Sequence, residues 1–373
     1  MSQAAHRSAT IREVARKAGV SRATVSNVLH GRDGRVGSAT KESVLQAIKD
    51  LNYRPPLSSS QGAELSHSLG LLIQNQDAHP LTRHGYYVPL FEGFLSGSIA
   101  KKRSVTIMNE SLWDSAQKGI RQYCDGRVDG ILIAAPPLGC TFLQELKDRG
   151  FPFIVIGGCQ NDSEIASVNC ENKQGGRKAA AHLAELGHTN IAYIGLGGAN
   201  YDSDLRQQGF TEELISRGLP APMIHVLADL PNAESVARII FASSELDQRP
   251  TAVFCFNDEV ARKLVESLKE LGIRVPEEVS VIGFDHTFEA TRGPERLTTI
   301  RQEIFEMAAQ GAMLLADMTT AAAEGRRPPI TKLVFQPDLV LGHTTGPAPS
   351  RHSLISHQAR NGSYIKQSES QSK

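Results

Sequence analysis

The chain has 373 residues, 40 basic and 40 acidic side chains, and a pI near 7.2. Its composition, 40% hydrophobic and 21% charged, excludes wholesale disorder, and no apolar run approaches the ~18 residues of a membrane-spanning helix. Five cysteines without a C-x-x-C pair argue against disulfide scaffolds and zinc knuckles. Because the N-terminus also lacks the apolar core of a secretory signal, we expect a cytoplasmic protein.

The charged side chains that sum to zero are unevenly distributed along the chain. Residues 1–56 carry ten basic and four acidic side chains, a formal charge of +6, so residues 57–373 carry −6. A small basic segment joined to an acidic remainder is typical of a nucleic-acid-binding module attached to another domain. A solvated basic surface has the same composition, so charge alone leaves both readings open.

The basic segment begins with the pattern of two short helices. Thr10 and Glu13 form a capping box, apolar residues at helical spacing follow, and Gly19 suits the left-handed end of the helix. Ser21 can cap a second helix, whose expected buried face is Val25, Val28 and Leu29. A glycine-containing turn of about three residues between two helices predicts a helix-turn-helix, which places its second helix in a DNA major groove.

A third helix is expected after Ser38, and Asn52 can close it. Its expected buried residues are Val44, Leu45, Ile48 and Leu51. Pro55 and Pro56 prevent the helix from continuing. The next residues, 57–68, include five serines and show no periodicity, so we assign them to a hinge or linker between a headpiece (1–56) and the rest of the chain.

From residue 69 onward, short apolar strands alternate with helices. The expected strands are Leu69–Ile73, Val105–Met108, Gly130–Ala134, Phe153–Ile156, Ile191–Ile194, Ile224–Leu227, Ala252–Phe256 and Ser280–Phe284. The expected helices include Lys173–Leu186, Ala233–Ser243 and Glu259–Leu271. This alternation predicts an α/β core with parallel sheets, and its length suits two doubly wound lobes.

We place this core at residues 69–344, with a disordered tail at 345–373. We place lobe 1 at about 69–169 plus 300–333 and lobe 2 at about 170–299 plus 334–344. The chain contains no P-loop, nucleophile elbow, zinc-binding helix or calcium loop, so we expect neither an enzyme nor a bound cofactor or metal.

Residues 10–26, TIREVARKAGVSRATVS, closely resemble the headpiece of the LacI/GalR family of bacterial transcription regulators. Further family motifs occur in the same order along the core: Glu185–His188, Arg206-x-x-Gly209-Phe210, Asn257–Glu259, Leu271–Pro276, Val279–Asp285 and Leu297–Gln302. The resemblance implies a DNA-binding headpiece, a hinge, and a two-lobed core like a periplasmic sugar-binding protein. It also implies a homodimer that binds double-stranded DNA and responds to a small effector, expected to be a carbohydrate.

The resemblance assigns roles to residues of the headpiece. Ser21 and Thr24 match positions that contact phosphate, and Ser21 is equally suited to cap its helix. Arg22 could donate two hydrogen bonds to guanine, while Ala23 could contact a thymine methyl group. A solvated or phosphate-bound arginine is the alternative for Arg22. The full set of expected DNA contacts is Thr10, Ser21, Arg22, Ala23, Thr24, Ser26, Asn27, Tyr53 and Arg54.

Two departures from the family pattern bear on the operator. Asn27 stands where an arginine is usual, and asparagine favours adenine. The family's hinge carries a leucine that enters the minor groove, but residues 59–62 offer none in register. Either Leu57 or Leu65 replaces that leucine, or operator bending is weaker.

Polar residues follow several predicted strands, and ligands of open parallel sheets bind beyond the carboxyl ends of the strands. Arg206, Asn257 and Asp285 occupy such places and match family ligand positions. Their guanidinium, amide and carboxylate groups suit a polyhydroxylated ligand. We interpret Asp258 as the N-cap of the helix that follows it, and a structural carboxylate is the alternative role for Asp285.

Tyr86 and Tyr87 match a family position where aromatic side chains form a stacking platform, although they could equally be core residues. The lining departs from the family elsewhere. The loop before the tyrosines is longer around Asp77–Arg83, while Gly157 and His286 stand where aspartates are common.

Our first hypothesis is therefore a homodimeric, ligand-responsive transcription factor, most simply a repressor, that reads a near-palindromic operator. The alternatives are a sugar-binding or sugar-converting protein that dimerises through its N-terminal helices, and a constitutive regulator without a working pocket. Gly157 is the residue that favours the last of these.

Overall fold

The computed structural model describes residues 10–29, 36–51, 53, 65–74, 85–110, 116–158, 163–197, 201–227, 238–241 and 249–350. The predictions made for Asn52 and Arg54, for Leu57 and residues 59–62 of the hinge, for Asp77–Arg83 and for most of Ala233–Ser243 lie outside these ranges. Within them, no helix is both long and apolar enough to cross a membrane.

The headpiece consists of α1 (Ile11–Ala18), α2 (Arg22–Leu29) and α3 (Ser38–Asp50). The capping box at Thr10 is present in full, and Gly19 ends α1 at φ +66°. Ser21 caps α2 by accepting a hydrogen bond from the Thr24 amide at 3.1 Å. The helices enclose a small core of Val14, Ala15, Val25, Val28, Val44, Ala47 and Tyr53.

One predicted core residue of the headpiece is wrong. Leu45 is half exposed, because it lies about 100° around α3 from Val44 and about 160° from Ala47, the two residues that face the core. An ion pair of 2.9 Å between Lys17 and Asp50 joins α1 to α3 at the surface.

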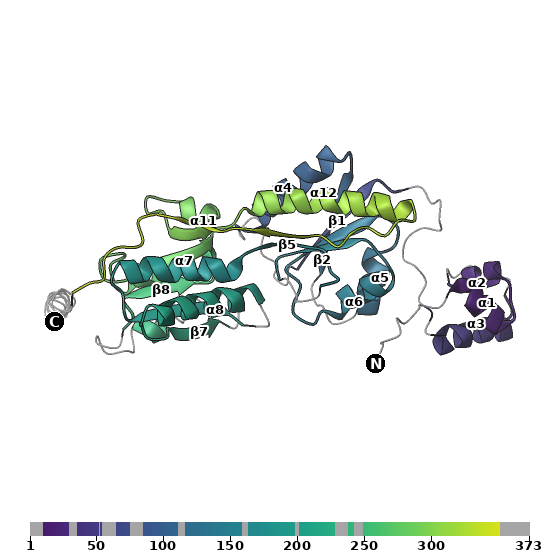
Figure 1. The fold of residues 1–373 in the computed structure, drawn as a ribbon, viewed down its shortest axis with the longest axis horizontal. Helices are drawn as coiled ribbons and strands as arrows, with labels where there is room; N and C mark the ends of the chain where they lie inside the picture. The colour runs from purple at the N-terminus through teal and green to yellow at the C-terminus, as the bar shows by residue number, and fades with distance from the viewer. Residues whose placement is uncertain are drawn as a thin grey trace, which may run out of the picture.

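The core contains two six-stranded sheets, one in each lobe (Figure 1). Lobe 1 has the strand order β11-β5-β4-β3-β1-β2, and lobe 2 has the order β12-β10-β9-β8-β6-β7. Every pairing is parallel except that of β10 with β12. The strands of lobe 1 are β1 (Ser68–Gln74), β2 (Ser104–Glu110), β3 (Gly130–Ala134), β4 (Phe153–Ile156), β5 (Ser167–Cys170) and β11 (Lys332–Phe335). Those of lobe 2 are β6 (Ile191–Leu196), β7 (Met223–Leu227), β8 (Ala252–Cys255), β9 (Ser280–Asp285), β10 (Thr298–Arg301) and β12 (Asp338–Val340).

Helices cover both sheets. Lobe 1 carries α4 (Tyr87–Ala100), α5 (Ala116–Tyr123), α6 (Thr141–Asp148) and α12 (Ile304–Ala323); lobe 2 carries α7 (Asn172–Glu185), α8 (Tyr201–Ser216), α10 (Asp258–Glu270) and α11 (Phe288–Thr291). In Figure 1, α4 lies along α12 and α7 along α8. Gly93 and Gly97 permit the first contact, since a Cβ at either would lie within 2.2 Å of a carbonyl oxygen of α12.

The chain crosses between the lobes three times, after β5, after β10 and after β11. Each crossing falls slightly later than the boundaries we expected at 169/170, 299/300 and 333/334. All eight predicted strands are present, whereas β5, β10, β11 and β12 were not predicted. The strand β5 (SVNC) and the strand β10 (TTIR) are short and rich in polar residues, so they lack an apolar run.

The chain stays bonded to lobe 2 beyond residue 345, where we expected a tail to begin. Thr345 bonds to His182 at 3.0 Å, and the Gly346 carbonyl accepts a hydrogen bond from His188 at 3.0 Å. The amide of Ala348 donates to Leu186. The ordered core therefore extends to at least Ala348, and residues 351–373 lie outside the described ranges.

Candidate ligand pocket and DNA-binding surface

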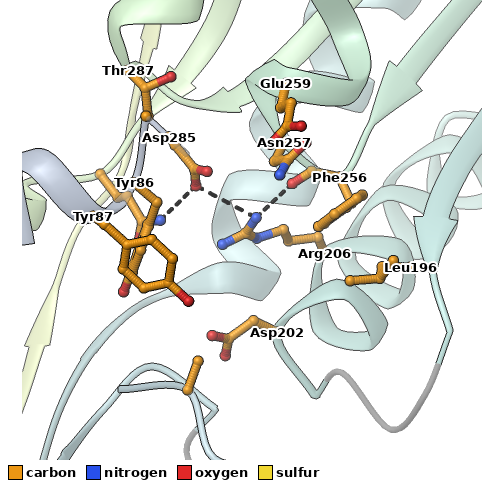
Figure 2. Close-up of a pocket in the computed structure, with 13 residues that line it drawn as sticks. Tyr86, Tyr87, Leu196, Asp202, Arg206, Phe256, Asn257, Glu259, Asp285 and Thr287 are labelled. Atoms are coloured by element: carbon orange, nitrogen blue, oxygen red, sulfur yellow. Dashed lines mark hydrogen bonds and ion pairs between the residues drawn. The ribbon is translucent and has the colours of Figure 1, made fainter. Parts of the chain in front are cut away.

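A cavity of about 200 Å³ lies between the two lobes (Figure 2). Lobe 1 contributes Gly85, Tyr86, Tyr87 and Ala135; lobe 2 contributes Leu196, Asp202, Arg206, Phe256, Asn257, Glu259, Asp285, Thr287 and Gln302. All five predicted ligand residues are thus brought together. The cavity is smaller than the ~300–1,000 Å³ typical of pockets for drug-sized ligands.

The cavity lies at the carboxyl ends of parallel strands. Ala135 follows β3, Leu196 ends β6, Phe256 and Asn257 follow β8, and Asp285 ends β9. The chain leaves the sheet at these ends, and ligands of open parallel sheets bind in the crevice beyond them.

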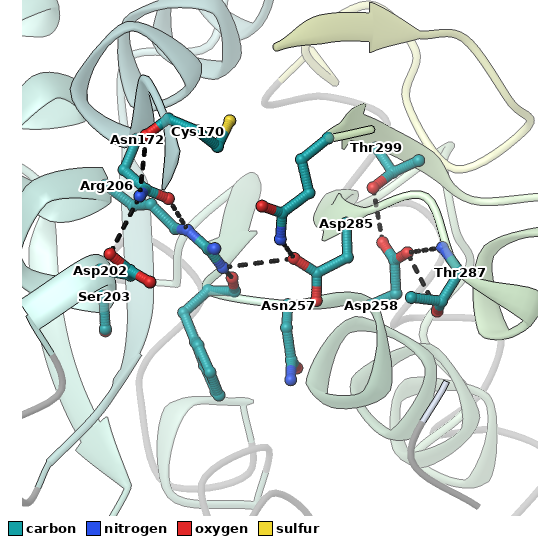
Figure 3. A network of polar contacts seen from close by, with 12 residues as sticks. Cys170, Asn172, Asp202, Ser203, Arg206, Asn257, Asp258, Asp285, Thr287 and Thr299 are labelled. Carbon is teal, nitrogen blue, oxygen red and sulfur yellow. Dashed lines mark hydrogen bonds and ion pairs between the residues drawn. The ribbon is translucent and has the colours of Figure 1, made fainter. Parts of the chain in front are cut away.

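Arg206 is the central cation of the pocket and is almost fully buried on α8 (Figure 3). Its Nε donates to Asn172 Oδ1 at 2.8 Å, and its Nη1 donates to the Phe256 carbonyl at 2.5 Å. Nη1 also lies 3.6 Å from Asp285 Oδ1. These contacts hold the guanidinium rigidly, and they are all supplied by lobe 2.

Asp285 enters the pocket from a strained turn. It has φ +105° and the next residue, His286, has φ +58°, conformations that are unusual for residues other than glycine. Gln302 Nε2 donates to Asp285 Oδ1 at 2.6 Å. Burial raises the pKa of Asp285 to about 6, while Arg206 and the Gln302 hydrogen bond oppose that rise.

The role predicted for Asp258 is wrong. Helix α10 begins one residue earlier than expected, so Asn257 is its N-cap and accepts a hydrogen bond from the Val260 amide at 2.9 Å. Asp258 points into the core, where it accepts from the Thr287 amide at 2.7 Å and from the Thr299 hydroxyl at 2.5 Å. Asp258 thereby holds the turn that carries Asp285, as Figure 3 shows.

The two tyrosines lie at the start of α4. Their rings meet edge to face with centroids 6.0 Å apart, and Tyr87 stacks on Phe91 at 6.0 Å with an interplanar angle of 17°. Both line the cavity, and both also pack against the hydrophobic core.

Sequence reasoning missed Asp202, Glu259, Thr287 and Gln302. Asp202 lies one helical turn before Arg206, and this spacing was the available signal. Its carboxylate accepts from the Gly158 amide of lobe 1 at 2.8 Å and from Asn172 Nδ2 at 3.0 Å. Asp202 therefore joins the two lobes beside the cavity.

On the headpiece, α2 presents most of its predicted DNA contacts to solvent. Ser21, Arg22, Ala23 and Asn27 are exposed, whereas Thr24 and Ser26 are half-buried. Thr10 is exposed, with its hydroxyl engaged by Glu13 in the capping box. Tyr53 differs from the others, because its side chain is only 6% exposed and packs in the headpiece core.

Two known domain models match this chain. Residues 10–56 match the family model of bacterial regulatory proteins of the lacI family, and residues 180–345 match a periplasmic binding protein-like domain. The HTH-type transcriptional repressor PurR of Vibrio parahaemolyticus is 30% identical over 298 residues, covering 79% of this chain and 87% of the relative. The chain belongs to the LacI family.

Other LacI-family proteins match over more of the chain. The transcriptional regulator DegA of Bacillus subtilis is 29% identical, and the match covers 91% of this chain and 98% of DegA. Among solved structures, a complex of the regulator CelR with cellobiose is 26% identical to this chain and has a TM-score of 0.68. The match covers 90% of this chain and 99% of the CelR chain. An operator-bound lac repressor dimer has a TM-score of 0.63 at 22% identity, a likeness of fold.

Within this LacI-family core, the atypical Gly157 has a structural consequence. Gly157 has φ +67°, and a Cβ placed on it would lie 3.2 Å from Asp202 Oδ2 and 3.6 Å from the Tyr86 hydroxyl. The space that a side chain would occupy at this position is therefore already lined by Asp202 and Tyr86.

Proposed function

We propose that this LacI-family regulator acts in the cytoplasm as a repressor that binds a near-palindromic operator as a homodimer. A small polyhydroxylated ligand between the lobes controls it. The observation that carries the proposal is the meeting of Arg206, Asn257 and Asp285 from one lobe with Tyr86 and Tyr87 from the other around one cavity. The CelR relative, whose structure contains cellobiose, makes a carbohydrate the first ligand class to test.

For DNA binding, the proposal assigns base contacts to Arg22, Ala23 and Asn27, and phosphate contacts to Ser21 and Thr24. Four of these five are exposed on α2 or immediately before it. The hinge lacks the family's leucine in register, so mutation of Leu57 and of Leu65 tests whether either residue replaces it or whether operator bending is weaker.

For dimerisation, the outer edge of lobe 2 is the surface we propose. The strand β7 is the edge of its sheet, and it exposes Ile224 and Val226. Ile215 and Ile239 are also more than half exposed. Exposed apolar groups of this kind favour a protein interface, and a second copy of the chain is the partner that a near-palindromic site requires.

The decisive experiment separates the two ends of the molecule. Selection from random DNA is expected to enrich a near-palindrome, and deletion of residues 1–56 is expected to abolish retardation of that DNA. The truncated core should keep the thermal shift that an active sugar produces. No preference for any palindrome would contradict the proposal, as would a sugar that leaves operator affinity unchanged after binding.

A further inference from the structure

The pocket wall contains an acceptor that crosses from one lobe to the other. Asp202 belongs to α8 of lobe 2, yet its Oδ2 accepts the amide hydrogen of Gly158, which follows β4 in lobe 1. The other oxygen accepts from Asn172 Nδ2 at 3.0 Å. Both of these donors are neutral, so neither of them compensates the charge of Asp202.

Gly157 of lobe 1 supplies no side chain at this place. It has φ +67°, a conformation that strains any residue with a Cβ, and the position of that Cβ lies 3.2 Å from Asp202 Oδ2 and 3.6 Å from the Tyr86 hydroxyl of lobe 1. The carboxylate on this side of the cavity is therefore supplied by lobe 2. Figure 2 shows the Asp202 carboxylate in the cavity wall on the opposite side of Arg206 from Asn257.

The charges around the cavity are unequal. Three carboxylates line it, those of Asp202, Glu259 and Asp285, and Arg206 is the only Lys or Arg among its described lining residues. Lys263 pairs with Glu259 at 3.1 Å. That pairing leaves two carboxylates facing one guanidinium.

Part of the guanidinium is already engaged. Arg206 donates through Nε to Asn172 and through Nη1 to the Phe256 carbonyl, and its guanidinium carbon lies over the Phe284 ring, 3.7 Å from the centroid. An incoming anion that bound the remaining N–H groups of Arg206 would approach two carboxylates in a partly desolvated site.

We propose that the cavity accepts uncharged or amino-substituted polyols and rejects their phosphorylated counterparts, with Asp202 as the residue that determines this preference. A hydroxyl or ammonium group can donate to the Asp202 carboxylate, whereas a phosphate dianion is repelled by it. This inference rests on the proposed ligand-binding role of the pocket and specifies the chemical class of its ligand.

The test is calorimetric titration of the full-length dimer with matched sets of aldoses. Each set contains the free sugar, its 2-amino derivative and its phosphate ester, for example glucose, glucosamine and glucose 6-phosphate. At least one free or amino sugar is expected to bind at least about tenfold more tightly than its phosphate ester. Asp202→Asn keeps an acceptor oxygen but removes the charge, and should bring this ratio below about threefold.

Asp204→Asn is the matched control, because Asp204 is exposed on the same helix and does not line the cavity. It should leave the ratio unchanged. Circular dichroism checks that both variants are folded. Retention of the wild-type ratio by folded Asp202→Asn would overturn the assignment of Asp202. If Asp202→Asn does not fold, the wild-type ratios decide the inference.

Two further results would overturn the ligand class. One is tighter binding of a phosphate ester than of its free and amino forms, and the other is no binding by any free or amino sugar. The proposed function survives either result if the wild type still selects an operator and if a phosphate ester changes the affinity for that operator. Loss of operator selectivity would contradict the proposed function itself.

Discussion

The guanidinium carbon of Arg206 lies 3.7 Å from the centroid of the Phe284 ring, so the arginine that lines the cavity rests on the strand that ends in Asp285. This contact joins α8 to β9 within lobe 2. A planar guanidinium can stack on the ring and still donate in its own plane to Asn172 and Phe256, which an ammonium group cannot do.

Arg206→Lys therefore keeps the charge but loses the stacking and the fork of donors. We expect ligand affinity to fall ~10–100-fold, since hydrogen bonds of charged groups contribute ~1.5–3 kcal/mol. Effector titration of operator retardation measures this, with Arg217→Lys as the control because that arginine lies outside the cavity. An unchanged response would show that Arg206 does not hold the ligand, and a wild type that responds to no effector would favour a constitutive regulator.

Asp258 offers a test of how the Asp285 turn is held. Burial and the nearby Asp285 raise the pKa of Asp258 well above its usual range, so a neutral amide is a close substitute. Asp258→Ala should lower the free energy of unfolding by ~2–5 kcal/mol, because it leaves Thr287 and Thr299 without their acceptor. Asp258→Asn should cost less than ~1 kcal/mol. Equal losses in urea unfolding would show that Asp258 must be ionised.

The raised pKa of Asp285 predicts a dependence of stability on pH. The folded protein retains a proton up to about pH 6, whereas an exposed aspartate releases it near 3.8. The stability contributed by this group is therefore complete below 3.8 and is lost as the pH rises through 6.

Relative to Asp285→Asn, the wild type should lose ~2–3 kcal/mol of unfolding free energy between about pH 4 and pH 7. Asp338→Asn is a control of opposite sign. The hydrogen bond from Lys178 lowers the pKa of Asp338, so its small contribution is lost as the pH falls. A pH-independent difference between wild type and Asp285→Asn would contradict the raised pKa.

Arg22→Ala should weaken operator binding by ~1–3 kcal/mol and relax specificity at one base pair. Binding to variant operators measures both effects. Arg326→Ala is the control, because Arg326 is exposed on the two-lobed domain, away from the headpiece sequence. An equal loss on every sequence would make Arg22 a phosphate contact.

Because the headpiece carries the positive charge, added salt should weaken operator binding steeply and leave binding of an uncharged ligand nearly unchanged.

Val226→Asp places a charge on the exposed edge strand β7 and should produce a monomer in light scattering. Operator affinity should then fall by at least ~100-fold, since two linked headpieces gain their effective concentration from dimerisation. Ile330→Asp, also on an exposed apolar residue but in lobe 1, is the control. A dimeric Val226→Asp would place the interface elsewhere.

Features that depend on neighbouring residues could be predicted from the sequence. The capping box of Thr10, the left-handed Gly19 and the strands of continuous apolar residues are local, because caps and periodicity act within a few residues. The placement of Arg206, Asn257 and Asp285 around one cavity was also predicted, since the carboxyl ends of parallel strands meet at one edge of each sheet.

Only the tertiary structure decided what those side chains contact. Asp258 was predicted to be a cap, but α10 starts at this residue and its buried carboxylate accepts a hydrogen bond from Thr287. The arrangement of the two lobes places Asp202 beside Gly158. Sequence spacing cannot predict such contacts, because they depend on how two sheets approach each other. The charge of the pocket follows from the same approach, since burial and pairing determine which carboxylates remain uncompensated.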